Sequence, residues 1–97
     1  MPTKPQFSVI IAVYNGADTI ARAIDSILEQ SWPAPEIIVI DDGSTDHSAD
    51  IVRGYGPPVR YLHQQNAGVS VARNHAVKQA RGDWLAFLDA DDWYLPD

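Results

Sequence analysis

Cysteine is absent from the sequence, and so are long apolar stretches. Without cysteine the chain has neither a disulfide framework nor a thiolate metal site. A membrane-spanning helix needs roughly 20 consecutive apolar residues, and no stretch approaches that length, so we expect no membrane span. The apolar run Phe7–Tyr14 is short, is interrupted by Ser8 and precedes no small-residue cleavage site, which indicates a buried strand rather than a signal peptide.

Positive charge is scarce, because 7 Lys and Arg stand against 13 Asp and Glu, a formal net charge of -6. This balance argues against a nucleic-acid partner. Neither a P-loop pattern nor a Gly-x-Gly-x-x-Gly pattern occurs, which argues against P-loop NTPases and dinucleotide-binding enzymes. With 45% hydrophobic and 21% charged residues, the 97-residue chain fits one small globular domain.

Four apolar runs alternate with helical patterns along the chain. The runs are Phe7–Tyr14, Glu36–Ile40, Val59–Leu62 and Trp84–Leu88. Because the first two lack polar alternation, they fit strands that are buried on both faces, as in a parallel sheet. Apolar residues recur at helical spacing in three places: Ile20, Ile24, Ile27 and Leu28; Ile51, Val52 and Tyr55; and Val69, Ala72, Ala76 and Ala80. The pattern predicts an α/β fold with a Rossmann-like β-α-β-α-β-α-β parallel sheet over residues 7–97, after a flexible tail at 1–6.

The expected helix starts are marked by short polar residues. Asp18 is expected to cap or charge the first turn of the first helix. Ser44, Thr45 and Asp46 are candidate N-caps for the second helix.

Ligands of open α/β sheets bind outside the carboxyl ends of the strands, and all four expected ends are polar or acidic. Asp89 and Asp91 follow the last strand one residue apart, and such carboxylates favour Mg²⁺ or Mn²⁺. The ion would join them to a diphosphate that an acidic chain otherwise repels. A solvated acidic turn is the alternative, but the adjacent aromatic pair Trp93-Tyr94 favours a site.

The other strand ends offer groups for a nucleotide. A carboxylate at Asp42 can accept a base N–H or ribose hydroxyls, or it can form a local turn. Tyr14 offers an aromatic face to a ligand or to the core. Arg73, one turn into the third helix, either contacts a base or phosphate or lies along the surface. The three histidines have no metal-ligand spacing.

Four segments, SVIIAVYN (8–15), IVIDDGSTD (38–46), NAGVSVARN (66–74) and FLDADD (87–92), resemble the N-terminal half of family 2 glycosyltransferases with the GT-A fold. The resemblance extends from Phe7 to the last residue. It implies a nucleoside-diphosphate sugar as donor, often a UDP-sugar, and inversion at the anomeric carbon. It also implies Mn²⁺ or Mg²⁺ as cofactor, acting as a Lewis acid on the leaving diphosphate.

The resemblance also implies roles for individual residues. Ala12, Tyr14 and Asn15 would line the base pocket, Asp42 would bind the base, and Asp89 would meet the ribose or sugar. Gly68 and Arg73 would contact the nucleotide, and Asp91 would coordinate the metal in the DXD-type motif. No catalytic residue is assigned, because the family's general base is expected beyond Asp97.

The resemblance therefore predicts the donor-binding half of a glycosyltransferase, truncated at its C-terminus, with an unknown acceptor such as a cell envelope polysaccharide. We expect a cytoplasmic location, at the inner face of the membrane if regions outside this segment anchor it. An exposed apolar face around Trp84–Leu88 is expected to drive self-association.

Two alternatives stay open. The chain could be a nucleotide- and metal-binding module without turnover of its own. A receiver-like phosphoryl-transfer domain using Asp41 and Asp42 would need a lysine on a later loop; because the only lysines are Lys4 and Lys78, we disfavour it.

Overall fold

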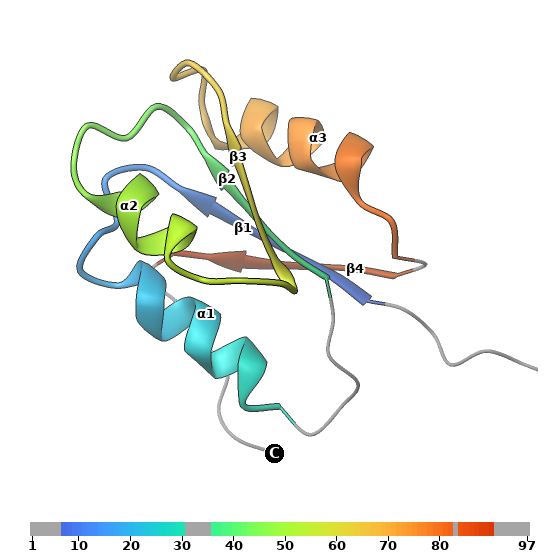
Figure 1. Cartoon of the computed structure of the whole chain (residues 1–97). Helices are drawn as coiled ribbons and strands as arrows, with labels where there is room; N and C mark the ends of the chain where they lie inside the picture. The colour runs from blue at the N-terminus through green and yellow to red at the C-terminus, as the bar shows by residue number, and fades with distance from the viewer. Residues whose placement is uncertain (1–6, 31–35, 83, 91–97) are drawn as a thin grey trace, which may run out of the picture.

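Four parallel strands form one sheet in the order β3-β2-β1-β4, with a helix after each of the first three strands (Figure 1). The computed structural model describes residues 7–30, 36–82 and 84–90. Its elements are β1 (Phe7–Val13), α1 (Ile20–Leu28), β2 (Glu36–Asp41), α2 (Ser48–Arg53), β3 (Val59–His63), α3 (Val69–Gln79) and β4 (Trp84–Asp89). The predicted β-α-β-α-β-α-β parallel sheet is confirmed. The tail predicted at residues 1–6 lies outside the described residues.

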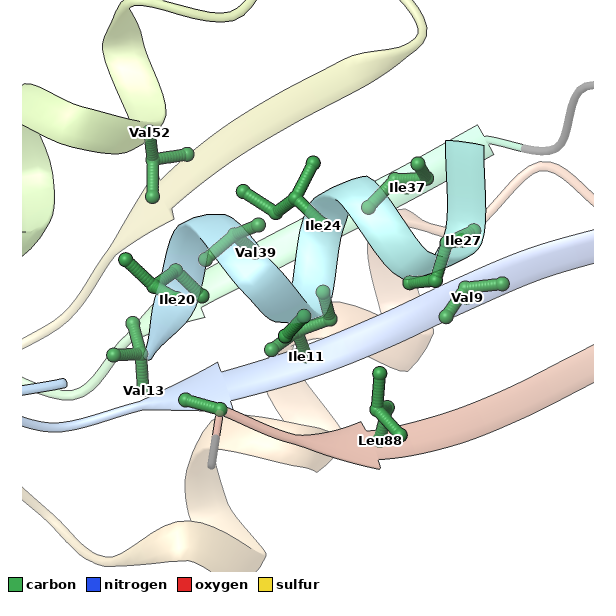
Figure 2. Close-up of a cluster of buried hydrophobic side chains, with 12 residues drawn as sticks. Val9, Ile11, Val13, Ile20, Ile24, Ile27, Ile37, Val39, Val52 and Leu88 are labelled. Atoms are coloured by element: carbon green, nitrogen blue, oxygen red, sulfur yellow. The ribbon is translucent and has the colours of Figure 1, made fainter. Parts of the chain in front are cut away.

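The two central strands are buried on both faces, as their unbroken apolar sequences predicted. Successive side chains of a strand point to opposite faces, so β1 and β2 each contribute side chains to two separate cores. The core beneath α1 and α2, drawn in Figure 2, contains Val9, Ile11, Val13, Ile20, Ala23, Ile24, Ile27, Ile37, Val39, Val52, Leu88 and Ala90. The core beneath α3 contains Ile10, Ile38, Ile40, Ala72 and Ala76. The small alanines let α3 lie close to the strands, as predicted.

Two residues of the predicted apolar helix stripes are exposed instead. Leu28 is 42% exposed because it lies about 100° around the helix from the buried Ile27, past the face that meets the sheet. Val69 is 47% exposed because it begins α3 at the carboxyl edge of the sheet, where it lines a cavity. Helical spacing therefore does not place either residue in the core.

The predicted helix caps were also wrong in part. The N-cap of α1 is Thr19 rather than Asp18, and it makes no side-chain capping bond. The N-cap of α2 is His47, so Ser44 and Thr45 lie too early in the chain to cap it. Asp46 does reach the helix, because its Oδ1 accepts the N–H of Ser48 at 2.9 Å.

The edge strand β4 leaves apolar side chains uncovered on the α3 face. Leu85 and Phe87 pair in register with Ser8 and Ile10 of β1, so they share the face on which α3 lies. Because α3 packs on β1 and β2, both side chains are exposed. Self-association through this face stays a prediction. No helix in the described ranges is both long enough and apolar enough to cross a membrane.

At the amino edge of the sheet, Glu36 ties three strands to the end of α3. Its carboxylate accepts the Ser8 hydroxyl at 2.9 Å, the Arg81 N–H at 2.8 Å and the guanidinium of Arg60. Burial alone would raise the pKa of Glu36, but these hydrogen bonds outweigh it, so the pKa lies below its ordinary value. This network lies far from the carboxyl ends of the strands and is structural.

Glu36→Gln is expected to lower the unfolding free energy by about 1–3 kcal/mol, because it removes charge-assisted bonds from a largely buried group. A carboxyl group whose pKa is lower in the folded state than in the unfolded state stabilises the fold at any pH above its unfolded pKa. This stabilisation is lost as the pH falls towards the folded pKa. Wild-type unfolding free energy should therefore decline below about pH 4.5, the ordinary glutamate value, and decline less in the variant.

Urea denaturation between about pH 3 and 7 measures this dependence. Glu29→Gln, at the exposed end of α1, controls for the change in net charge. Equal pH dependence in wild type and Glu36→Gln would contradict the prediction.

Candidate functional site

The carboxyl ends of the four strands meet at one edge, as predicted. In the sheet register Ala12 of β1 lies between Ile40 of β2 and Asp89 of β4, and Asp41 lies beside His63. The predicted nucleotide-site residues lie at the ends of β1 and β4, in the loops after the strands and in the first turns of α3. The predicted meeting of the four strand ends at one edge is confirmed.

A cavity of about 670 Å³ opens at this edge, within the size range of small-molecule sites. It is lined by Ala12, Tyr14, Asn15, Gly16, Thr19, Val69, Arg73, Asp89 and Ala90. Five of these are predicted nucleotide-site residues, namely Ala12, Tyr14, Asn15, Arg73 and Asp89. Tyr14 is 54% exposed, so its ring is available to a ligand and is not core.

Asp42 lies beside a second, smaller cavity. That cavity has a volume of about 70 Å³ and is lined by Ala12, Val13, Tyr14, Asp42 and Val69. Gly68 lines neither cavity; it is the N-cap of α3, with a φ of 101°. Asp42 and Gly68 therefore do not line the main cavity.

Asp42 is 5% exposed, and its carboxylate is held by the loop between β3 and α3. Its Oδ1 accepts the Gln64 side-chain amide and the Ala67 N–H, each at 2.8 Å. Its Oδ2 accepts the Gly68 N–H at 3.0 Å and the Asn66 side-chain amide at 3.4 Å. Although burial raises the pKa of Asp42, these bonds outweigh it and lower the pKa, which keeps the carboxylate charged.

Asp41 is also engaged within the protein. Its Oδ1 accepts the Ser44 N–H at 2.8 Å and its Oδ2 accepts the Tyr61 hydroxyl at 2.7 Å. Burial and the Asp41 carboxylate raise the pKa of Tyr61 to about 12, so the phenol stays a donor. With both carboxylates in internal hydrogen bonds, the geometry gives no support to a phosphoacceptor site at Asp41 and Asp42.

Asn15 joins the loop after β1 to the loop after β2. Its Oδ1 accepts the Thr45 N–H at 2.7 Å and the Asp46 N–H at 3.3 Å. In return, the Asn15 N–H donates to the Ser44 hydroxyl at 2.8 Å, and the Gly16 N–H donates to the Ser48 hydroxyl at 3.0 Å. Asn15 therefore lines the cavity while its side-chain oxygen holds the neighbouring loop.

The backbone of Asn15 lies in the left-handed region, with a φ of 50°. Asn15→Ala should lower the unfolding free energy by about 2 kcal/mol, because it loses the loop hydrogen bonds and strains the backbone. Asn15→Gly, which adopts positive φ without strain, should cost about 1 kcal/mol. Urea denaturation measures both variants, and the difference between them isolates the backbone term. Wild-type stability in both would show that the two loops are not held through Asn15.

Arg73 and Asp89 form an ion pair in the wall of the main cavity. The Arg73 guanidinium donates to Asp89 Oδ1, and its carbon lies 5.9 Å from the centre of the Phe87 ring. Both side chains of the ion pair are substantially exposed, so the pair stabilises the fold little and the guanidinium is accessible from solvent. Arg73 is the one cation among the described residues of the cavity lining.

The described residues alone do not make up a metal site. Within the described ranges, no group of three or more His, Asp or Glu side chains is arranged to hold an ion. Asp89 supplies one carboxylate with the oxygen chemistry that Mg²⁺ and Mn²⁺ favour. The predicted ligand Asp91, like Asp92 and the aromatic pair after it, lies outside the described residues.

The sequence reading missed four residues of the cavity lining: Gly16, Thr19, Val69 and Ala90. The need for glycine at position 16 is visible only in the structure, because a Cβ there would lie 2.8 Å from Val13 Cγ2 and 3.3 Å from Ala90 Cβ. A hydroxyl residue between a strand end and a helix, such as Thr19, could have been noticed from the sequence.

The chain is similar in sequence to bacterial glycosyltransferases. An uncharacterized glycosyltransferase of Escherichia coli K12, YibD, is 48% identical over 99% of this chain and 29% of its own length. Glycosyltransferase GlyA of Streptococcus pneumoniae is 37% identical over 100% of this chain and 14% of its own length.

Two solved structures are similar in three dimensions. Staphylococcus aureus TarS in complex with UDP-GlcNAc has a TM-score of 0.85 and 35% identity, over 91% of this chain and 27% of that chain. The mannosyltransferase PcManGT from Pyrobaculum calidifontis, in complex with GDP-Man and Mn²⁺, has a TM-score of 0.88 and 30% identity, over 95% of this chain and 29% of that chain. The chain thus spans less than a third of the length of each of these four proteins.

The profile of glycosyl transferase family 2 matches residues 8–97, which is nearly the whole chain. The fold is that of GT-A enzymes. The chain belongs to glycosyl transferase family 2.

Proposed function

We propose that this chain binds the nucleoside-diphosphate sugar of a glycosyltransferase, with a UDP-sugar as donor. The observation that carries the proposal is the 670 Å³ cavity at the carboxyl edge, which gathers five predicted nucleotide-site residues. Its volume lies within the range of small-molecule sites. The similar structures with UDP-GlcNAc and GDP-Man support the class of ligand.

Different residues of the cavity would contact different parts of the ligand. The exposed Tyr14 ring offers a face on which a base can stack. Arg73 offers a guanidinium fork for phosphate oxygens, and Asp89 offers a carboxylate oxygen for ribose hydroxyls. Asp91 would hold Mn²⁺ or Mg²⁺, which neutralises the leaving diphosphate when bound.

A second candidate is a module that binds the nucleotide sugar without transferring it. It is favoured by the cavity lining, where the one described carboxylate, Asp89, is paired with Arg73 and is not placed as a free general base. Under this alternative the base and the acceptor site belong to other parts of the protein. Transfer with inversion is proposed for the whole protein.

Calorimetric titration of UDP with and without Mn²⁺, on wild type and Asp91→Asn, tests the donor site. We expect wild type to bind UDP more tightly with Mn²⁺, and the variant to lose that gain because the metal loses a charged ligand. Equal UDP affinity in both proteins under both conditions would rule out Asp91 as the metal ligand.

Turnover separates the two candidates. Incubation of the 97-residue chain with UDP-sugars and Mn²⁺, followed by detection of free UDP, measures hydrolysis or transfer. Release of UDP would contradict the binding-module alternative. Binding without release would support it.

A further inference from the structure

The Asp42 carboxylate has no acceptor position left for a ligand. An ionised carboxylate accepts about four hydrogen bonds. Oδ1 of Asp42 takes those of Gln64 and Ala67, and Oδ2 takes those of Gly68 and Asn66. All four donors come from the loop between β3 and α3. A base that donates an N–H to Asp42 must therefore replace one of them.

The cavity beside Asp42 is also too small for a base in this form of the protein. Its volume of about 70 Å³ is room for about two water molecules. The main cavity is nearly ten times larger but does not include Asp42 in its lining. The two cavities share Ala12, Tyr14 and Val69, so a base in the main cavity can approach Asp42, where it must compete with the loop donors for the carboxylate.

Asn66 makes the weakest of the four contacts. Its amide nitrogen lies 3.4 Å from Oδ2, whereas the other three donors lie at 2.8–3.0 Å. The same nitrogen donates to the main-chain oxygen of Asp42 at 3.0 Å. Because both neighbours are acceptors, the amide nitrogen and not the oxygen must face them. Asn66 is exposed, so its side chain can move into solvent without opening the core.

The turn after β2 is shaped to bring the loop this close. Gly43 has a φ of 80°, and a Cβ there would lie 2.8 Å from the Asn66 main-chain nitrogen. Only glycine therefore permits the contact between the two loops at this separation. The contact between Asn66 and Asp42 therefore depends on glycine at position 43.

We propose that Asn66 gates the base pocket: its amide occupies Oδ2 of Asp42 in the free protein, and the base displaces it on binding. This inference rests on the proposed donor function. The best competitor for Oδ2 is a base with a ring N–H between carbonyl groups, such as the imide of uracil. Cytosine has no hydrogen at that ring position, so it competes less well. Asn66 is thereby a determinant of nucleotide affinity and base selectivity.

Asn66→Ala tests the gate because it frees one acceptor position on Oδ2 and keeps the main-chain donors. We expect UDP to bind the variant about threefold to tenfold more tightly than wild type in the presence of Mn²⁺, the range of one net hydrogen bond. The affinity for CDP should change less. Gln65→Ala, an exposed neighbour in the same loop, is the matched control and should bind UDP as wild type does.

NMR supplies a second measurement that does not depend on a variant. The side-chain amide signals of Asn66 should shift when UDP and Mg²⁺ are added to wild type, and those of Gln65 should stay in place. UDP binding that is unchanged or weakened in Asn66→Ala would overturn the gate while leaving the donor site intact. Absence of UDP binding in wild type and in Asn66→Ala would overturn the donor site, and the gate with it.

Discussion

Asp42→Ala is expected to lower the unfolding free energy by about 3 kcal/mol, the largest stability effect of any single substitution at the site. The substitution removes the acceptor for two main-chain N–H groups and two side-chain amides of the β3–α3 loop. A hydrogen bond to a charged group contributes about 1.5–3 kcal/mol, and Asp42 is buried away from water. Small domains are marginally stable, so this loss is a large fraction of the total.

Asp42→Asn should cost less than Asp42→Ala but more than a surface change. Its amide keeps one acceptor oxygen and places a donor where the Oδ2 or Oδ1 contacts need acceptors. Urea denaturation of both variants measures the loss. Asp18→Ala, on the exposed stretch before α1, removes the same charge and should change stability by less than about 0.5 kcal/mol. If Asp42→Ala unfolds at the wild-type urea concentration, the loop is not held by this carboxylate.

Because the pKa of Asp42 is lowered in the folded protein, its contribution to the unfolding free energy depends on pH. Its lowered native pKa stabilises the fold at neutral pH, and that stabilisation is lost as the pH falls below the ordinary aspartate value of about 3.8. Asp42→Asn should therefore show a shallower loss of stability in acid than wild type. A steeper loss in the variant would contradict the sign of the shift.

The fold could be predicted because its signals are local. Ile37–Ile40 is a β-branched run that favours a strand, and its lack of polar alternation indicates burial on both faces. Ala72 and Ala76 mark the helix face that meets the sheet. The position of Leu28 could not be predicted in this way. Periodicity gives the centre of an apolar face, and a residue at its margin is exposed or buried according to where the sheet ends.

The site could be predicted only as far as the edge on which it lies. Ala12, Tyr14 and Arg73 come to one cavity because parallel strands end together, which the strand order along the chain already implies. The bonding of Asp42 and Asn15 could not be predicted. Their partners lie 22–31 residues further along the chain, and each contact depends on how the intervening loop folds back. A carboxylate at a strand end looks the same in the sequence whether a ligand or its own loop occupies it.

Arg73→Ala is expected to weaken UDP binding about tenfold to a hundredfold, the largest effect on binding among the described residues. The chain has a net charge of -6, and Arg73 is the one cation among the described residues that line the cavity. A charge-assisted hydrogen bond to a phosphate is worth about 1.5–3 kcal/mol, which corresponds to this loss. The unfolding free energy should change by less than about 1 kcal/mol, because an exposed ion pair such as that of Arg73 and Asp89 stabilises little.

The separation of binding from stability is what distinguishes a ligand-binding arginine from a structural one. Calorimetric titration with UDP and Mn²⁺ measures the first quantity, and urea denaturation measures the second. Arg53→Ala is the matched control: it removes the same charge from α2, where the guanidinium stacks 4.8 Å from the centre of the Tyr61 ring and outside the cavity lining. Arg73→Lys keeps the charge but not the planar fork, so it should recover only part of the affinity. If Arg73→Ala loses stability and keeps UDP affinity, then Arg73 serves the Asp89 pair alone, and the diphosphate must be held by the metal.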